Sequence, residues 1–439
     1  MFKTLVGAFK NKDIRKKILY TLMILVIVRV GSLLPIPGVD TEYFSSLLSG
    51  INTGDLSYLS AFTGGSFERM SLFALSITPY ITSSIIMQLL TIAIPKLEEM
   101  QKEGEDGRKK IASITRYVTI GLSLIESIAM AVGFGRSGLI KDSAQLSTLH
   151  YVVCIIVVIA ALTAGSAVLM WLGERITEKG VGNGISIVLL INIISGMPSD
   201  FATLYSTFVA PKTPAKGVLA AVIILAILIV MVVLVCFLQD GERRIPVQYS
   251  QKVSGRRTVG GQSTNIPLKV NTAGVMPIIF ASSLMQFPVI IAQLFGKSYE
   301  WTRYLSSSYW CRVEAPKYSI GLLVYIVLLI IFAYFYTSIT FNPIEVADNL
   351  KKAGGVIPGI TPGKSTSEYL NKILNYIVFI GAVGLLIIAL IPIMCTGFFN
   401  ASVSFGGTSI IIIVGVVLET LKQIESQMCN RYYKGFLSE

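Results

Sequence analysis

The feature that most limits how this chain folds is a succession of apolar runs, each close to the roughly 20 residues that an α-helix needs to cross a bilayer. Charged residues make up only 14% of the chain, against roughly 25% in soluble domains. The sequence therefore predicts an all-α polytopic membrane protein with ten transmembrane helices. The predicted spans are residues 18–34, 70–94, 114–134, 149–172, 185–208, 218–238, 273–295, 319–341, 373–391 and 408–428.

Lysine and arginine are distributed unevenly between the two sides of these spans. The N-terminal tail, residues 1–17, holds six, the loops and tail on the same side hold twenty-one, and the opposite loops hold eight. Because basic residues accumulate on the cytoplasmic side, both termini are predicted to be cytoplasmic, with a C-terminal tail at 429–439. The net charge of +12 is then explained by topology and by contact with anionic lipids or a partner.

The ten spans divide into an N-terminal half, 18–208, and a C-terminal half, 218–428. An odd number of spans in each half forces the halves to be inverted relative to one another, and inverted halves build a site at their interface. The second and seventh spans correspond in the two halves. Both open with a proline, in Thr78-Pro79 and Met276-Pro277, which supports this division.

The second predicted span carries two kinds of side chain on separate stripes. Ile77, Ile81 and Ile85 are spaced four apart and share one helix face, while hydroxyl side chains such as Thr82 are costly against lipid. An aliphatic constriction dewets and conducts ions poorly, but a polymer can part it. The same spacing also fits ordinary packing residues, and the pattern leaves both readings open.

The segment between the first two spans, residues 35–68, contains no lysine or arginine. Its glycines, among them Gly64 and Gly65, allow it to fold back as a short helix between flexible joints. A re-entrant segment of this kind requires surrounding protein or a water-filled cavity. The alternative is an ordinary extracytoplasmic loop.

Polar residues inside membrane spans are candidates for function. Glu126 lies within the third span and Asn271 lies at the start of the seventh. They either hold the bundle together through hydrogen bonds or form, with the hydroxyls of the second span, a polar seam that opens. Arg29, near the end of the first span, is expected to extend its charged group towards the interface.

Two cytoplasmic loops, 239–272 and 342–372, are long enough to meet a partner. The first is predicted to form a hairpin with Ser254, Gly255, Arg256 and Arg257 at its tip. In the second, GITPGKS departs from a phosphate-binding loop because Pro358 stands where a glycine is needed, so no nucleotide binding is expected. With one histidine and scattered cysteines, the sequence predicts no metal site, no cofactor and no enzymatic activity.

Several strings in the chain resemble the SecY family, the pore subunits of the bacterial protein-conducting channel. They occur in order along nearly the whole chain: LLPIPGVD, AFTGGSFERMSLFALSITPYITSSIIMQLL, KEGEDGRKKI, WLGERITEKGVGNGIS, QSTNIPLKVNTAGVMPIIFASS, FNPIEVADNLKKAGGVIPGITPG and FGGTSIII. The resemblance implies a bacterial cytoplasmic-membrane channel. It would conduct unfolded secretory polypeptides across the membrane and release transmembrane segments sideways into lipid.

The resemblance also implies roles for individual residues. A pore ring would comprise Ile77, Ile81, Ile185, Leu189, Ile279 and Ile412. A plug, about residues 44–66, would include Phe62, Gly64 and Gly65. A lateral gate would involve Thr82, Glu126, Asn271 and Phe287, and partner binding would involve Arg256, Arg257, Thr361 and Lys364. Ile85 would lie outside the ring.

The partners implied by the resemblance are SecE-like and SecG-like membrane subunits, the SecA ATPase, the ribosome, signal peptides and nascent chains. Energy would come from a partner or the membrane potential. One position departs from the family pattern, because many relatives have arginine where this chain has Thr361, and a hydroxyl cannot replace a bidentate guanidinium. From the residues alone, an inverted-repeat secondary transporter for a small solute remains the alternative function.

Overall fold

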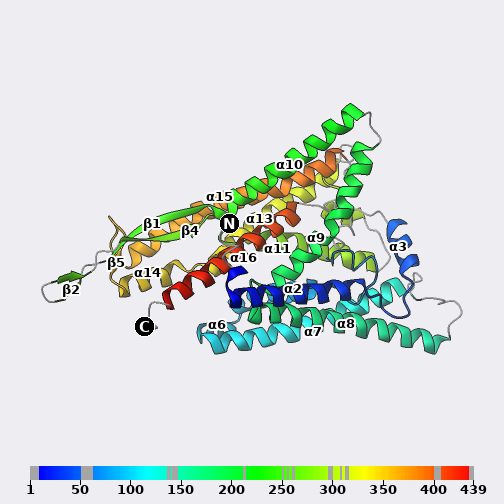
Figure 1. The fold of residues 1–439 in the computed structure, drawn as a ribbon, viewed down its shortest axis with the longest axis horizontal. Coiled ribbons are helices and arrows are strands. Elements are labelled where there is room, and N and C mark those ends of the chain that lie inside the picture. Colours follow the sequence, from blue (N-terminus) through cyan, green and yellow to red (C-terminus); the bar gives the residue numbers. More distant parts are fainter. Residues whose placement is uncertain are drawn as a thin grey trace.

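The computed structural model describes residues 9–50, 63–135, 140, 147–210, 214–249, 252–254, 257–259, 263–294, 300–306, 309–311, 316–399 and 407–434. It is mainly helical (Figure 1). The first part of the chain forms α2 (Lys12–Leu33), α3 (Thr41–Gly50), α5 (Thr78–Ala93), α6 (Pro95–Lys102), α7 (Glu105–Gly135), α8 (Thr148–Lys179), α9 (Gly184–Leu204) and the π-helical turn η1 (Tyr205–Val209). The second part forms α10 (Pro214–Asp240), α11 (Met276–Leu294), α12 (Glu300–Leu305), η3 (Pro316–Ser319), α13 (Ile320–Thr340), α14 (Pro343–Lys352), α15 (Lys364–Phe399) and α16 (Gly407–Lys434).

Each predicted span overlaps one of these helices. In the described part of the chain, six helices are long and apolar enough to cross a bilayer, or seven if α5 and α6, which meet at a bend of 100°, count as one span. The apolar part of α11 is shorter, Met276–Met285, and α2 and α16 carry charged residues within their length. The structure thus supports a multi-pass membrane protein.

Two predicted spans begin later than the hydropathy suggested. The second span was predicted from residue 70, but residues 70–77 form turns and α5 starts at Thr78, with Pro79 in its first turn where a missing N–H costs nothing. Met70 and Ser76 adopt positive φ angles of 42° and 52°. The seventh span was predicted from residue 273, but α11 begins at Met276.

The helices form two groups that follow the chain order (Figure 1). In the first group, α7 packs against α5 and α8, and α8 packs against α2 and α9. In the second, α13 packs against α11 and α15, and α16 packs against α10 and α15. The main contacts between the groups join η1 to α10, which follow one another in the chain, α9 to α16, and α7 to α11. The last two join elements that are far apart in the sequence.

A small β-sheet forms one end of the molecule, which we call the sheet end. Strand β1 (Glu242–Tyr249) pairs antiparallel with β4 (Ser263–Lys269) and with β5 (Gly355–Val356), giving the order β4-β1-β5. Ile245 and Val247 of β1 point to a core that also contains Leu370 of α15, and Pro246 between them is exposed. The two loops predicted to meet partners are thus one folded unit.

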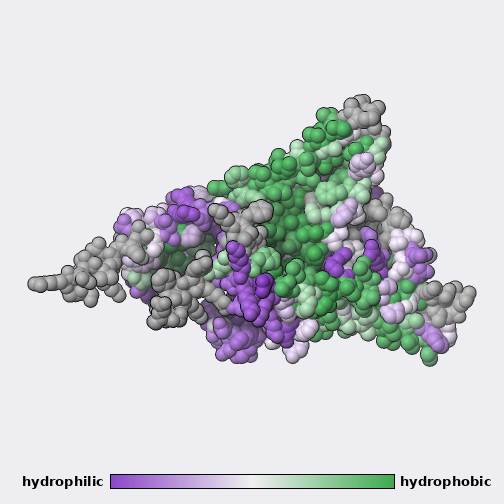
Figure 2. Space-filling model, in the orientation of Figure 1, coloured by the Kyte–Doolittle hydropathy of each residue, from purple (hydrophilic) through white to green (hydrophobic). Residues whose placement is uncertain are grey.

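Hydrophobic residues cover much of the helical body, and hydrophilic residues gather over the sheet and over α6 and the beginning of α2 (Figure 2). The beginning of α2 and the end of α16 lie together, because Lys17 Nζ donates to Gln427 Oε1 at 3.3 Å and Ile14 shares a core with Ile424. The two ends of the described chain therefore lie on one side, as the even number of predicted spans requires.

Candidate pore and gate

The six residues predicted to line a pore all belong to one larger apolar cluster in the structure, which also includes side chains of α2 and α8. Three of them are buried and three are partly buried. They come from both helix groups: Ile77 and Ile81 at the start of α5, Ile185 and Leu189 on α9, Ile279 on α11 and Ile412 on α16. We call this set the aliphatic ring. Ile85, one turn further along α5, is not part of the cluster.

Local sequence explains why α9 presents two residues of the aliphatic ring. Asn183 caps the helix, its Oδ1 accepting a hydrogen bond from Ile185 N at 3.2 Å. Gly184 allows close approach to α8, since a Cβ there would lie 1.9 Å from the carbonyl oxygen of Gly173. Ile185 and Leu189 are four residues apart and therefore share one face.

The turn before α5 is attached to α9 just beyond the ring. Asn192 Nδ2 donates to Ser76 Oγ at 3.0 Å, and both residues are buried. Asn192 lies close to one turn after Leu189 on the same helix. Sequence reasoning did not single out Asn192, although an asparagine inside an apolar span is a signal of the kind that singled out Glu126.

The predicted plug residues contact the same stretch of α9. Gly64 has a φ angle of 63°, and a Cβ there would lie 2.7 Å from the backbone oxygen of Asn192. Ser195 Oγ donates to Gly64 O at 3.5 Å. Gly65, with φ 78°, has nothing within 4 Å of its Cβ position. Phe62 lies outside the described residues.

The predicted gate residues occupy three elements. Thr82 on α5 donates to its own helix, with Oγ1 at 3.1 Å from Thr78 O. Glu126 is partly buried on α7. Asn271 is buried in the turn between β4 and α11, and its Nδ2 has no hydrogen-bond partner, so its predicted place at the start of the seventh helix is wrong by one turn. Phe287 falls within α11, and its side chain lies outside what the structure describes.

Helix packing brings the gate elements near one another without joining their side chains. α7 contacts both α5 and α11. In the described part of the chain, no hydrogen bond links Thr82, Glu126 and Asn271 to one another. Without hydrogen bonds between these side chains, the free-energy cost of separating the helices is lower.

The predicted partner-binding residues lie on the unit at the sheet end. Strands β2 (Lys252–Ser254) and β3 (Arg257–Val259) form the expected hairpin, with Ser254 opposite Arg257. Arg256 and the side chain of Arg257 lie outside the described residues. Thr361 is exposed, and its carbonyl oxygen accepts a hydrogen bond from Thr366 Oγ1 at 3.0 Å. The Lys364 side chain is 92% exposed.

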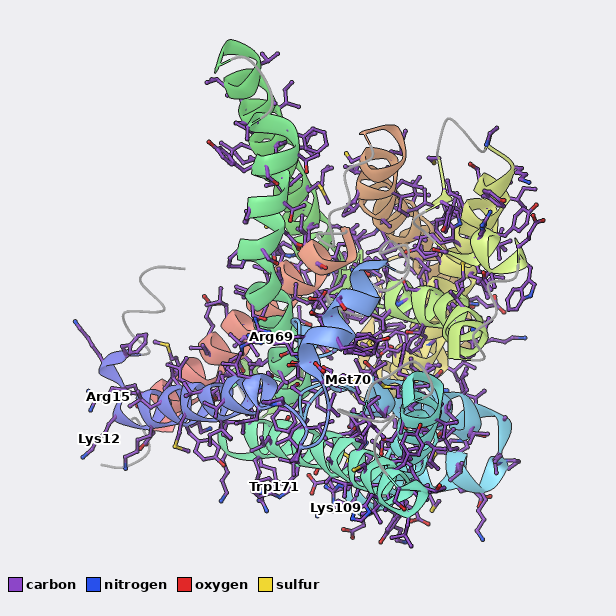
Figure 3. The ribbon with its side chains drawn as sticks, turned by 90° about the vertical axis from the view of Figure 1, so that its right-hand side faces the viewer. Lys12, Arg15, Arg69, Met70, Lys109 and Trp171 are labelled. Carbon is purple, nitrogen blue, oxygen red and sulfur yellow. The ribbon has the colours of Figure 1, made fainter. Side chains whose placement is uncertain are left out.

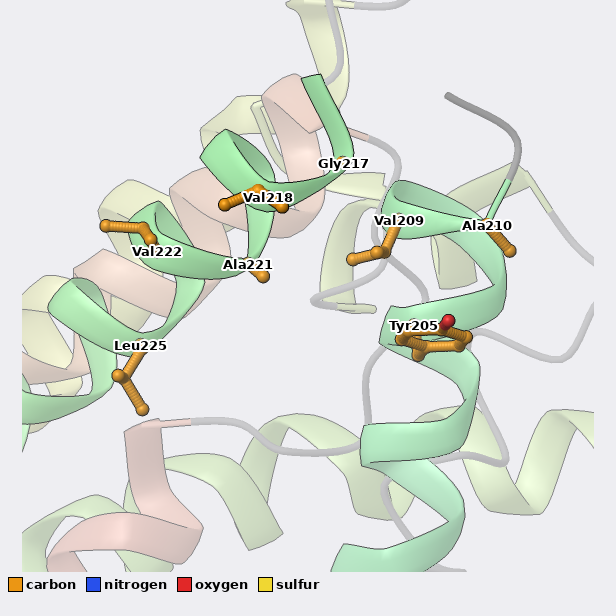
Figure 4. Close-up of a pocket in the computed structure, with 8 residues that line it drawn as sticks. All are labelled: Tyr205, Val209, Ala210, Gly217, Val218, Ala221, Val222 and Leu225. Carbon is orange, nitrogen blue, oxygen red and sulfur yellow. The ribbon is translucent and has the colours of Figure 1, made fainter. Parts of the chain in front are cut away.

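A cavity of about 610 Å³ opens between η1 and α10, where the two helix groups join in sequence (Figure 4). Its lining side chains are aliphatic apart from Tyr205. No lining residue belongs to the aliphatic ring. The cavity is therefore separate from the candidate pore.

A family model described as SecY matches residues 71–421. The chain belongs to the SecY family. The protein translocase subunit SecY of Streptomyces galbus is 44% identical over 452 residues, with 100% of each chain covered. That of Halalkalibacterium halodurans is 43% identical over 446 residues with the same coverage, and that of Staphylococcus epidermidis is 41% identical over 440 residues, covering 99% of each chain.

Solved structures of similar fold are also described as channels. One described as a protein conducting channel has a TM-score of 0.64 at 17% identity, with 94% of this chain and 92% of that chain covered. Canine Sec61 in a ribosome-channel complex has a TM-score of 0.59 at 17% identity and the same coverage. At this identity the likeness shows the fold. Together with the relatives, it confirms the predicted function, a channel subunit of the protein translocase.

Proposed function

We propose that this chain is the central channel of a Sec translocon, conducting unfolded secretory polypeptides and releasing transmembrane segments laterally into lipid. The observation that carries the proposal is the aliphatic ring, because residues from α5, α9, α11 and α16 meet in one cluster. Aliphatic side chains that meet across a seam exclude water and ions when closed. A passing polypeptide displaces them and is surrounded by them.

The proposed architecture is ten transmembrane helices in two inverted halves of five. The separate packing of the two helix groups supports this division. The sheet end faces the cytoplasm, because its loops belong to the side whose loops and tails together carry most of the basic residues, and both termini lie on that side. The membrane is then the bacterial cytoplasmic membrane, in keeping with the bacterial relatives.

Lateral release follows from the proposed gate between α5, α7 and α11. A signal-peptide helix that separates these elements is exposed to lipid on one side and to the channel on the other. Each Leu, Ile, Phe or Val at the centre of a segment favours lipid by roughly 0.3–0.6 kcal/mol. Polar segments continue through the ring. The plug around Gly64 and Gly65 would cover the ring until a chain enters.

Several partners are part of the proposal. The unit formed by β1, β4 and β5 would dock a ribosome or the SecA ATPase, with Arg256, Arg257 and Lys364 as contacts. SecE-like and SecG-like subunits would complete the membrane complex. The chain acts as a passive channel, and the partner or the membrane potential supplies the energy.

A crosslinking experiment tests the proposal. A single cysteine replaces Ile81, and a secretory precursor is stalled in translocation with a competent motor present. We expect Ile81→Cys to crosslink to the precursor and Ile85→Cys, one turn away and outside the ring, to crosslink much less. A working motor and no crosslink at position 81 would show that Ile81 does not line the path of the polypeptide.

A further inference from the structure

Two arginines that have no part in the proposed channel lie near the C-terminal end of α2. Arg29 is four residues from Leu33, the last residue of that helix, and is partly buried. The neighbouring side chains Val26 and Val30 are 62% and 53% exposed. Exposed valines on a membrane-spanning helix face lipid, so Arg29 lies at the edge of a lipid-facing surface.

Backbone pairing fixes Arg69 beside the same end of the helix. Ile36 N donates to Met70 O at 3.1 Å and Leu72 N donates to Leu34 O at 2.9 Å. These bonds hold residues 70–72 antiparallel to the stretch that directly follows α2. Figure 3, a view from the α3 end, shows Arg69 towards the end of α2 that is opposite Lys12 and Arg15.

Neither arginine of this pair belongs to an ion pair in the described part of the chain, and their two positive charges repel each other. Arg29 Nη1 is buried and has no hydrogen-bond partner. A charged donor in that state is costly, and because Nη1 is buried where the side chain now lies, the guanidinium has to turn outwards to meet an acceptor at the interface.

We propose that Arg29 and Arg69 form a binding site for the phosphate of an anionic phospholipid, in the leaflet at the α3 end. Guanidinium groups bind phosphate oxygens through paired, charge-assisted hydrogen bonds. A lipid brings its phosphate to the interfacial depth where Arg29 ends, and its acyl chains lie along the exposed Val26 and Val30. A water-soluble phosphate has no part that covers these valines.

The position of this site in the leaflet rests on the proposed membrane topology, but lipid binding can be measured without translocation. The full chain, purified with its complex in mild detergent, is titrated with phosphatidylglycerol, phosphatidylcholine or glycerol 3-phosphate, and bound lipid is counted by native mass spectrometry. The variants are Arg29→Gln, Arg69→Gln and the double variant. Arg303→Gln is the matched control, because Arg303 is an exposed arginine on a different element, α12.

We expect the double variant to bind phosphatidylglycerol about thirtyfold more weakly, since each arginine contributes roughly 1 kcal/mol towards an anionic lipid. The control and wild type should bind equally. Arg29→Lys, which keeps the charge but loses the planar fork, should fall between wild type and Arg29→Gln.

Any of three results of the lipid titration would overturn the proposal: equal phosphatidylglycerol binding by the double variant and wild type, equal binding of phosphatidylcholine, or saturation by glycerol 3-phosphate. Crosslinking of Arg29 or Arg69 to a carboxylate of a small membrane subunit would overturn it too. The Ile81→Cys crosslink is scored separately in the same variants, so a failure of the lipid site is distinguished from a failure of the channel proposal.

Discussion

The side-chain amide of Asn192 donates a hydrogen bond to the hydroxyl of Ser76 at 3.0 Å, and so ties α9 to the turn that precedes α5. Ser76 has a positive φ angle of 52°, a conformation that costs energy for a residue with a Cβ. The bond therefore helps to hold a strained turn. Because that turn leads directly into Ile77, its position affects the aliphatic ring.

Replacing Asn192 with alanine should loosen this turn. Loss of one buried hydrogen bond costs about 1 kcal/mol, and local opening should become about fivefold more frequent. Hydrogen exchange of the amides in residues 70–77, followed by mass spectrometry, measures the change. Asn371→Ala is the control, since Asn371 is exposed on α15. Unchanged exchange in Asn192→Ala would show that the turn is held by other contacts.

A polar residue in the aliphatic ring should make the resting channel leak ions. We expect Ile81→Ser to admit water to the constriction, because a hydroxyl opposes dewetting, while Ile81→Val keeps an aliphatic surface. Potassium efflux from proteoliposomes containing the purified complex measures the leak. The matched control, Ile85→Ser, makes the same change on the same helix outside the ring. Equal leaks from Ile81→Ser and Ile85→Ser would contradict the assignment of Ile81.

The two glycines of the predicted plug should respond differently to alanine. Both have positive φ angles, 63° at Gly64 and 78° at Gly65, but only Gly64 lacks room for a Cβ. Gly65→Ala should cost about 1 kcal/mol of backbone strain, and Gly64→Ala should cost about 2–3 kcal/mol because it also collides with Asn192. Thermal unfolding of the purified complex compares them. A larger effect at Gly65 would be inconsistent with the contact between Gly64 and α9.

An arginine at Thr361 should strengthen docking of a ribosome or motor at the sheet end. Thr361 is exposed, so the longer side chain requires no repacking. We expect Thr361→Arg to tighten binding about tenfold through a bidentate contact, and Thr361→Lys, which supplies only a point charge, to do less. Affinities are measured at fixed salt with membranes containing each variant. Equal gains from lysine and arginine would point to simple charge attraction.

A substitution in the buried core beneath the sheet should weaken docking, although it alters no side chain on the exposed surface. Val247 is fully buried beneath β1, and Val247→Asp places an unpaired charge in that core. We expect the unit to unfold locally and docking to be lost, while Gln248→Asp, whose side chain lies on the other face of the strand, has little effect. The same binding assay, with limited proteolysis of the loops, reports both. Normal docking by Val247→Asp would show that partner binding does not depend on the folded sheet.

Apolar length and charge distribution in the sequence were sufficient to locate helices in all ten predicted regions and to predict that the chain ends share one side. Apolar length and loop charge are each sums over neighbouring residues, so they can be calculated without knowing which residues contact one another in space. The helix starts predicted at Met70 and Ala273 were missed because turn residues just before each helix, such as Phe73 and Val275, are as apolar as helix residues. The strands in the sheet-end loops left a partial signal in the sequence, because the apolar Ile245 and Val247 are separated and flanked by residues that are not buried in β1.

Only the tertiary structure decided which apolar side chains meet. Residues facing lipid and residues facing other helices are equally apolar, so hydropathy cannot tell a pore-lining isoleucine from a lipid-facing one. Crossing of α5, α9, α11 and α16 gathered Ile77, Leu189 and Ile412 with the rest of the aliphatic ring. The same is true of β5, which joins a loop about a hundred residues earlier in the chain, because strand pairing depends on position in space and leaves no mark in local composition.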